Sequence, residues 1–361
     1  MTHSPREARS PQLESIQVLR LVAASLVMFA HAKMVLRDDE VWARWDASMA
    51  ACGVDVFFVI SGFVVAMSAA RATSARAFMT DRMLRVLPLY FLVSSLFVAK
   101  RIASGEGLGT NEWLNSLLFL PLLDRDDYTS PVHPYGWSIA FEMWFYGLLA
   151  LLLAWFAPLR AAGMCAGVLA FGAVVVACAY PGSWVLPRFL FSPLGLEFAA
   201  GCVLYLLRDK IRPRAWMAAC VAPGLMVAVA YTSYLGYPTE VIGRAGMSFA
   251  RALIWGGLAV CVFVLFYAAE KKVRWPRSLV ALGTASYSIY LIQPFVVRVV
   301  RGLEVSGSLR VACFIGVSVA AGWLMYLCLE RPLMHLAKAW LRRPPPLEPV
   351  VKAAVLRRSA A

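Results

Sequence analysis

The chain has 361 residues, of which 61% are hydrophobic and only 16% charged, and its mean hydropathy is +0.68. Soluble domains are about 45–50% apolar and about 25% charged, so this composition excludes an ordinary soluble domain and predicts an all-α bundle of membrane-spanning helices. A net charge of +14 would suggest nucleic-acid binding in a soluble protein. Here the basic residues gather in short segments between apolar stretches, so we expect membrane lipid and no nucleic acid as a partner.

The eight cysteines all lie within apolar stretches, without a CxxC pair and without a nearby histidine. Isolated cysteines of this kind are typical of small buried hydrophobic side chains. We therefore expect no metal site and no disulfide framework. The absence of P-loop, GxGxxG, HExxH and GxSxG motifs excludes the common soluble ATPases, dehydrogenases and hydrolases.

Ten apolar segments are each long enough to cross a bilayer, which needs about 20 residues per helix. In chain order they cover residues 16–36, 49–70, 84–104, 136–157, 161–180, 186–207, 214–232, 248–269, 279–300 and 309–330. A shorter apolar segment, 113–123, cannot cross and is expected to form a re-entrant or interfacial helix. The sequence therefore predicts a polytopic bundle of about ten transmembrane helices.

The distribution of charge predicts the orientation of this bundle. If the N-terminus is cytoplasmic, the inner segments carry most of the 35 basic residues, while the longest outer loop, 105–135, is acidic. This positive-inside bias places both termini in the cytoplasm. We expect one transmembrane domain over residues 1–341 and a disordered cytoplasmic tail over residues 342–361.

Charged groups inside apolar segments are costly and mark candidate sites. Arg20 and His31 are eleven residues apart on the first segment, so they share one helix face and lie about 16 Å apart along it. Either residue alone is more simply a headgroup contact or an interfacial histidine. Asp55 and Glu142 lie in the outer halves of their segments, at the predicted depth of His31. An imidazole beside carboxylates can act as a general base; the alternative is a structural polar network between helices.

Three further features lie within or beside the apolar segments. Arg82 and Arg85 are three residues apart on one helix face at the inner side, where two guanidinium groups suit phosphate. Without other evidence, an ordinary positive-inside anchor is the simpler interpretation. Glu197 lies within the sixth segment, where it could pair with an arginine or assist the site. Gly62 and Gly201 are interpreted as points of close helix contact.

Six segments carry distinctive patterns in a fixed order. They are SIQVLRLVAASLVMFAH (15–31), GVDVFFVISGF (53–63), DRMLRVLPLY (81–90), WSIAFEMWFY (137–146), SYSIYLIQPF (286–295) and ERP (330–332). As a set they resemble the membrane-bound acyltransferase 3 family over nearly the whole chain. The first is similar to its Arg-x10-His signature and the fourth to its Trp-Ser-x-x-x-Glu motif. The opening and LEFAAG (196–201) look most like the branch that O-acetylates bacterial exopolysaccharides. Many relatives have a second glutamate where Met143 stands, and a histidine where Gln293 stands.

The resemblance implies a multi-pass enzyme of the bacterial inner membrane. It would transfer an acyl group, usually acetyl, from cytoplasmic acyl-CoA to a hydroxyl of a polysaccharide or a lipid-linked oligosaccharide, either directly or through an acyl-histidine. His31 is then expected to act as general base, oriented by Glu142 and Asp55. The arginines expected to hold the CoA phosphates are Arg20, Arg82 and Arg85.

Buried charges in a ten-helix bundle are equally natural in a transporter or flippase for a lipid-linked sugar. That alternative lacks the internal two-fold repeat and the matching broken helices common in transporters. A purely structural membrane subunit is the third hypothesis, and it leaves the matched depth of the ionisable groups without a purpose.

Overall fold

The computed structural model describes residues 13–36, 48–180, 182–211, 224–225 and 249–341. Within these ranges the chain forms helices and no strand, apart from an isolated β-bridge between Arg125 and Trp184. The helices are α1 (Glu14–Ala32), η1 (Lys33–Val35), η2 (Ser48–Cys52), α2 (Gly53–Ala69), α3 (Ala75–Ala103), α4 (Thr110–Leu118), α5 (Gly136–Leu153), α6 (Pro158–Ala179), α7 (Val185–Leu190), α8 (Gly195–Leu206), α10 (Phe249–Ala269), α11 (Arg277–Thr284), α12 (Ser286–Arg301), α13 (Gly307–Met325), η3 (Tyr326–Glu330) and α14 (Arg331–Leu341).

Eight helical stretches of the described chain are long and apolar enough to cross a bilayer, and α11 with α12 makes a ninth if this bent pair is one span. The protein is therefore a multi-pass membrane protein. Apart from residues 224–225, the expected span at 214–232 lies outside the described residues, as does the expected tail at 342–361. The cytoplasmic placement of the termini stays a prediction.

Two of the differences between the described helices and the expected spans concern α3 and the pair α11 and α12. Helix α3 begins at Ala75 rather than at residue 84, because the Ser74 hydroxyl caps it by accepting a hydrogen bond from the Ala77 amide at 3.1 Å. The expected span 279–300 is instead two helices, α11 and α12, bent by 66° at Ala285. Hydropathy alone cannot detect that break, because the apolar composition continues across it.

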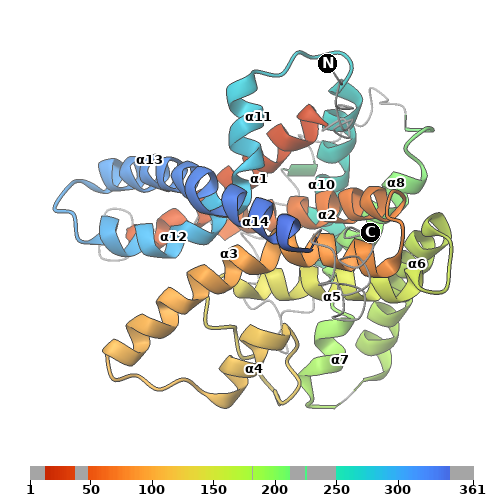
Figure 1. Cartoon of the computed structure of the whole chain (residues 1–361), viewed down its shortest axis with the longest axis horizontal. Helices are drawn as coiled ribbons and strands as arrows, with labels where there is room; N and C mark the ends of the chain where they lie inside the picture. The colour runs from red at the N-terminus through yellow and green to blue at the C-terminus, as the bar shows by residue number, and fades with distance from the viewer. Residues whose placement is uncertain (1–12, 37–47, 181, 212–223, 226–248, 342–361) are drawn as a thin grey trace, which may run out of the picture.

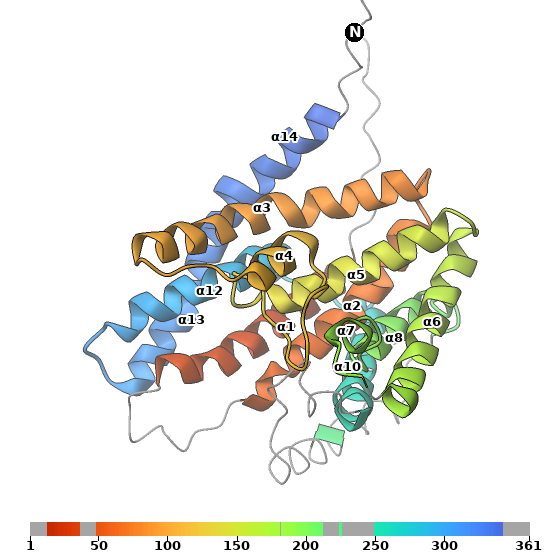
Figure 2. The ribbon, with the colours of Figure 1, turned by 90° about the horizontal axis from the view of Figure 1, so that it is seen from below.

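The helices pack as one bundle (Figure 1). Helix α1 lies against α11 and α2, and α2 lies against α8. At one end of the bundle α12 packs beside α13, and at the other end α6 packs beside α8. Figure 2 shows the long helix α3 extending along one side of the bundle, where it contacts α5 and α12. Side chains of α1, α2, α3 and α5 can therefore meet in the interior.

Two glycines bring α2 and α8 into backbone contact. A Cβ atom added at Gly62 would lie 2.1 Å from the carbonyl oxygen of Phe198, and one added at Gly201 would lie 2.2 Å from that of Val59. No larger residue fits at either position without moving a backbone. The interpretation of both glycines as points of close helix contact is confirmed.

The short apolar segment forms α4, whose nine residues are too few to cross a bilayer. Its polar side points inwards, where the Asn115 amide donates a hydrogen bond to the Asp124 carboxylate at 2.9 Å. Its exposed side carries Trp113, Leu117 and Leu118. This arrangement is typical of a helix that lies at a membrane interface.

Candidate active site

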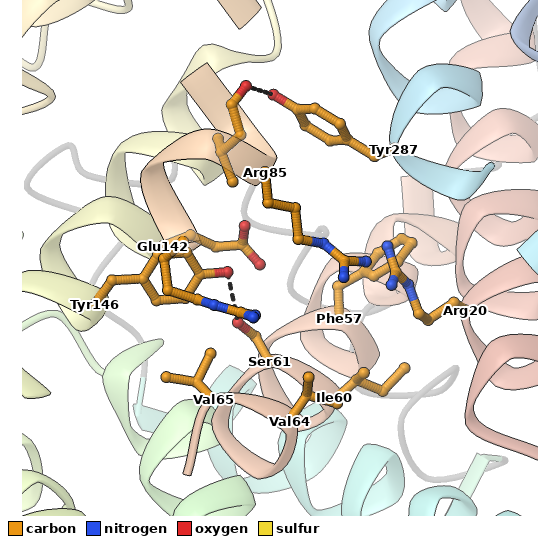
Figure 3. Close-up of a pocket in the computed structure, with 12 residues that line it drawn as sticks. Arg20, Phe57, Ile60, Ser61, Val64, Val65, Arg85, Glu142, Tyr146 and Tyr287 are labelled. Atoms are coloured by element: carbon orange, nitrogen blue, oxygen red, sulfur yellow. Dashed lines mark hydrogen bonds between the residues drawn. The ribbon is translucent and has the colours of Figure 1, made fainter. Parts of the chain in front are cut away.

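Two arginines from different helices enter one pocket, which we call the arginine pocket (Figure 3). Arg20 comes from α1 and Arg85 from α3, and their guanidinium groups face each other beside Phe57. The cavity volume of the pocket is about 70 Å³. The polar residues that line it are Arg20, Ser61, Arg82, Arg85, Glu142, Tyr146 and Tyr287. The structure thus brings the three arginines expected from the sequence together with one of the two expected carboxylates.

The charges in this pocket are unevenly compensated. Arg85 repels Arg20, while Glu142 and Glu330 attract it. Neither Arg20 nor Arg85 makes a hydrogen bond or a salt bridge with any described residue, and both side chains are only half-buried. Their N–H donors are therefore available to an anion, for which two planar guanidinium groups are well suited.

Arg82 differs from its two neighbours because its charge is already paired. Its guanidinium donates a hydrogen bond to the Asp81 carboxylate at 2.6 Å, and the other oxygen of Asp81 lies 3.0 Å from the ammonium group of Lys338 in α14. Arg82 therefore lines the pocket with its charge offset by Asp81, and it is Asp81 that joins α3 to α14.

Glu142 lies with the arginines rather than with His31. Its carboxyl group neighbours Ser61 and Tyr146, and the charges of Arg20 and Arg85 act on it. The hydroxyl oxygens of Ser61 and Tyr146 are 3.4 Å apart, as the dashed line in Figure 3 marks. A carboxylate here offsets part of the positive charge of the pocket.

A second pocket, with a cavity volume of about 80 Å³, adjoins the first, and we call it the apolar pocket. The two share Arg20, Phe57, Glu142 and Tyr287. The other residues that line the apolar pocket are Val54, Phe58, Ser138, Ile139, Ser286 and Tyr290. An apolar cavity next to two unpaired arginines can hold a ligand that has an anionic end and an uncharged end.

His31 lies in the last turn of α1 and is held by two residues from elsewhere in the chain. Its ring stacks on Tyr135, with the ring centroids 4.0 Å apart and an angle of 11° between the planes. Its Nδ1 atom is 2.7 Å from Oε1 of Gln293 in α12. Tyr290 connects this group to the apolar pocket, because it lines the pocket and its hydroxyl donates to the Tyr135 carbonyl at 3.1 Å.

Asp55 does not contact His31. Its carboxylate forms a salt bridge of 3.1 Å with Arg251 of α10, and the carboxyl group of Glu197 in α8 lies beside both. Among the described residues, no carboxylate forms a hydrogen bond or salt bridge with His31. The expected orientation of His31 by Asp55 and Glu142 is thus not what the geometry gives, because equal depth in the bilayer does not fix the direction in which each helix face points. For Asp55 the structural-network alternative applies.

Sequence reasoning missed several residues of this arrangement. Arg251 carries a charge within an apolar segment, which is the signal that could have identified a partner for Asp55. Tyr135 lies in the connection between α4 and α5, so nothing local indicates its stacking on His31. Glu330 begins the ERP motif and lies at the end of the π-helical turn η3; such turns are frequent at functional sites. Among the described residues, no group of three or more His, Cys, Asp or Glu side chains could hold a metal ion.

Comparison with protein families decides the class of this protein. Residues 13–327 match the acyltransferase 3 model, which is described as an acyltransferase domain. The chain belongs to the acyltransferase 3 family. It is therefore a membrane acyltransferase, and the resemblance inferred from the six sequence segments is confirmed. Family membership also favours an enzyme over the transporter and structural-subunit hypotheses.

Three curated proteins are similar to the chain over most of its length. The exopolysaccharide production protein ExoZ of Rhizobium meliloti (strain 1021) is 32% identical, over 81% of this chain and 92% of that protein. Nodulation protein 10 of Rhizobium leguminosarum bv. viciae is 31% identical, over 93% and 97%. The acyltransferase MdmB of Streptomyces mycarofaciens is 25% identical, over 92% and 93%. No solved structure matches the chain.

Proposed function

We propose that the protein transfers an acyl group, acetyl in the first instance, from cytoplasmic acyl-CoA to a hydroxyl of a cell-surface polysaccharide or a lipid-linked oligosaccharide. Its location would be the bacterial inner membrane. The observation that carries the proposal is the pair Arg20 and Arg85, two unpaired guanidinium groups in a pocket reached by the same helix that holds His31. The relative whose name refers to exopolysaccharide production supports a carbohydrate acceptor.

The donor fits the two adjoining pockets by its chemistry. The phosphates of CoA are the anions that Arg20 and Arg85 can bind through paired N–H donors. The uncharged thioester arm is suited to the apolar pocket. Because that pocket adjoins the residues around His31 through Tyr290, the thioester would approach the histidine from the arginine side.

His31 supplies the base for the transfer. Its imidazole takes the proton of the acceptor hydroxyl as the oxygen attacks the thioester carbonyl carbon, and the carbon–sulfur bond then breaks. The proton held by the imidazole passes to the leaving CoA thiolate, which gives the ester, free CoA and neutral His31. Glu142 contributes by setting the net charge of the arginine pocket, not by contact with the imidazole.

Transfer can be tested with purified protein in proteoliposomes. The wild-type protein is incubated with acetyl-CoA labelled in the acetyl group and with the lipid-linked oligosaccharide fraction of the host membrane, and the glycans are analysed by mass spectrometry. We expect labelled O-acetyl groups with the wild type and none with His31→Ala. Unlabelled glycans from wild-type protein that still binds CoA would contradict the proposal.

A further inference from the structure

Among the described residues, His31 has one hydrogen-bond partner, the side-chain amide of Gln293. The Nδ1 to Oε1 distance is 2.7 Å, and Gln293 is fully buried in α12. In this orientation of the Gln293 amide the oxygen faces the ring and can only accept a hydrogen bond, so Nδ1 carries the proton. A neutral imidazole with its proton on Nδ1 keeps a lone pair on Nε2.

We propose that Gln293 is a positioning residue that holds His31 in the Nδ1–H tautomer, so that Nε2 is the atom that accepts the proton of the acceptor hydroxyl. This inference rests on the proposed function and names the atom that performs it. His31 as a residue is only partly buried, and Gln293 contacts the Nδ1 atom of its ring.

A neutral partner has a chemical consequence that a carboxylate would not have. In hydrolase triads a buried carboxylate orients the histidine and also stabilises the imidazolium that forms. Gln293 provides the same orientation without the negative charge. The imidazolium of His31 is therefore less stabilised, which favours rapid return of the proton to the leaving thiolate.

The surroundings of Gln293 and His31 are held in place by a second histidine. His133 is fully buried, donates from Nε2 to the Leu291 carbonyl at 3.2 Å and accepts at Nδ1 from the Tyr135 amide at 3.1 Å. It thus ties Tyr135, which stacks on His31, to the turn of α12 that carries Gln293. Among the described residues, Tyr135 is the ionisable side chain that stacks on the His31 ring.

The tautomer can be measured without any acceptor substrate. The chain has only four histidines, so ring-labelled ¹⁵N-histidine in nanodiscs gives spectra that single His→Gln variants can assign. We expect the Nδ1 of wild-type His31 to carry the proton and its Nε2 to be unprotonated. In Gln293→Met, which has similar size but no acceptor, we expect this preference to be lost. A proton on Nε2 in the wild type, or an unchanged tautomer in Gln293→Met, would overturn the inference.

Transfer kinetics provide a second measurement. We expect Gln293→Met to lower kcat by about 10–100-fold, as is typical for loss of a group that orients a histidine, with KM for acetyl-CoA unchanged. Gln293→Glu keeps the acceptor and should restore kcat at high pH. Its acid limb should move to higher pH, because a carboxylate stabilises the imidazolium of His31.

Controls separate this inference from the proposed function. Gln17→Met makes the same substitution on α1, about 21 Å along the helix from His31, and should leave kcat unchanged. Each variant is first checked for monodisperse elution and for CoA binding. If the wild type transfers acetyl groups but Gln293→Met and Gln293→Glu match it in rate and pH profile, the role of Gln293 is refuted while the proposed function stands. If the wild type transfers nothing, the proposed function fails, and the tautomer measurement still decides the inference.

Discussion

Replacing Arg85 with glutamine should affect the free and the donor-bound protein differently. In the free protein Arg85 repels Arg20 but attracts the carboxylates of Glu142 and Glu330, so these contributions offset and its loss should leave the unfolding temperature little changed. In the presence of donor the same guanidinium would bind phosphate, so its loss should weaken CoA binding. A residue with only a structural role would not give this combination, because its loss would lower stability in both states.

The size of the binding effect follows from the hydrogen bonds that are lost. A hydrogen bond to a charged group contributes about 1.5–3 kcal/mol, so Arg85→Gln should raise the Kd for CoA by about 10–100-fold. CoA at a concentration of 100 times the wild-type Kd should raise the unfolding free energy by about 2.7 kcal/mol. A tenfold loss of affinity reduces this increase to about 1.4 kcal/mol at the same CoA concentration. Arg20→Gln should weaken CoA binding to a similar extent. The double variant should lose less binding free energy than the sum of the two single variants, because both groups act on one anion.

Isothermal titration and thermal unfolding with and without CoA measure both effects on the same detergent-solubilised samples. Arg76 provides a matched control, because it lies on α3 as well but is exposed and does not line either pocket. Arg76→Gln should leave the Kd unchanged. Equal Kd values for wild type and Arg85→Gln, or a large loss of stability in the free Arg85→Gln protein, would refute the assignment of Arg85 to the donor.

Three further predictions concern stability. Gly62→Ala should lower the unfolding free energy by about 1–3 kcal/mol, because the added Cβ meets a backbone. Gly167→Ala, where the space is open, should be neutral or stabilising. Equal unfolding free energies of the two variants in denaturation experiments would show that the contact at Gly62 is unimportant. Asp55→Asn should lower the unfolding free energy by less than the about 3–5 kcal/mol typical of breaking a buried ion pair, because Glu197 remains beside Arg251. An altered pH profile of the remaining activity would argue instead for a catalytic Asp55. Burial lowers the pKa of His133 to about 4, so between pH 6.5 and 4 the unfolded chain binds a proton that the folded chain does not. The unfolding free energy should therefore fall by up to about 3 kcal/mol as the pH decreases through that window, and this decline should be absent from His133→Gln.

The sequence predicts the spans and the arginines well because both depend on local patterns. Apolar length identifies a crossing helix without knowledge of its neighbours. The spacing of Arg82 and Arg85 predicts that they share one helix face, and positive-inside bias predicts that they lie on the same side of the bilayer as Arg20. Both rules can be applied without knowledge of tertiary contacts. In the structure, Arg20, Arg82 and Arg85 line the same pocket.

The partners of each buried charge could not be predicted from the same patterns. Depth along a helix follows from residue number, but the direction of a side chain around the bundle depends on how helices pack. Asp55 therefore points to Arg251 and Glu142 to the arginines, although both were expected beside His31. The contact between His31 and Gln293 joins residues 262 positions apart, and no local pattern connects them.

The central claim is that the donor is bound at the arginines and the proton is removed at His31, on the opposite side of the bilayer. The most direct test uses proteoliposomes with labelled acetyl-CoA enclosed on one side and the lipid-linked oligosaccharide acceptor accessible to a hydrophilic quench on the other. The account predicts labelled acceptor on the face opposite the donor, formed by wild type and by Arg76→Gln but not by His31→Ala. Labelling that requires donor and acceptor on the same face, or labelling that persists in His31→Ala, would contradict it.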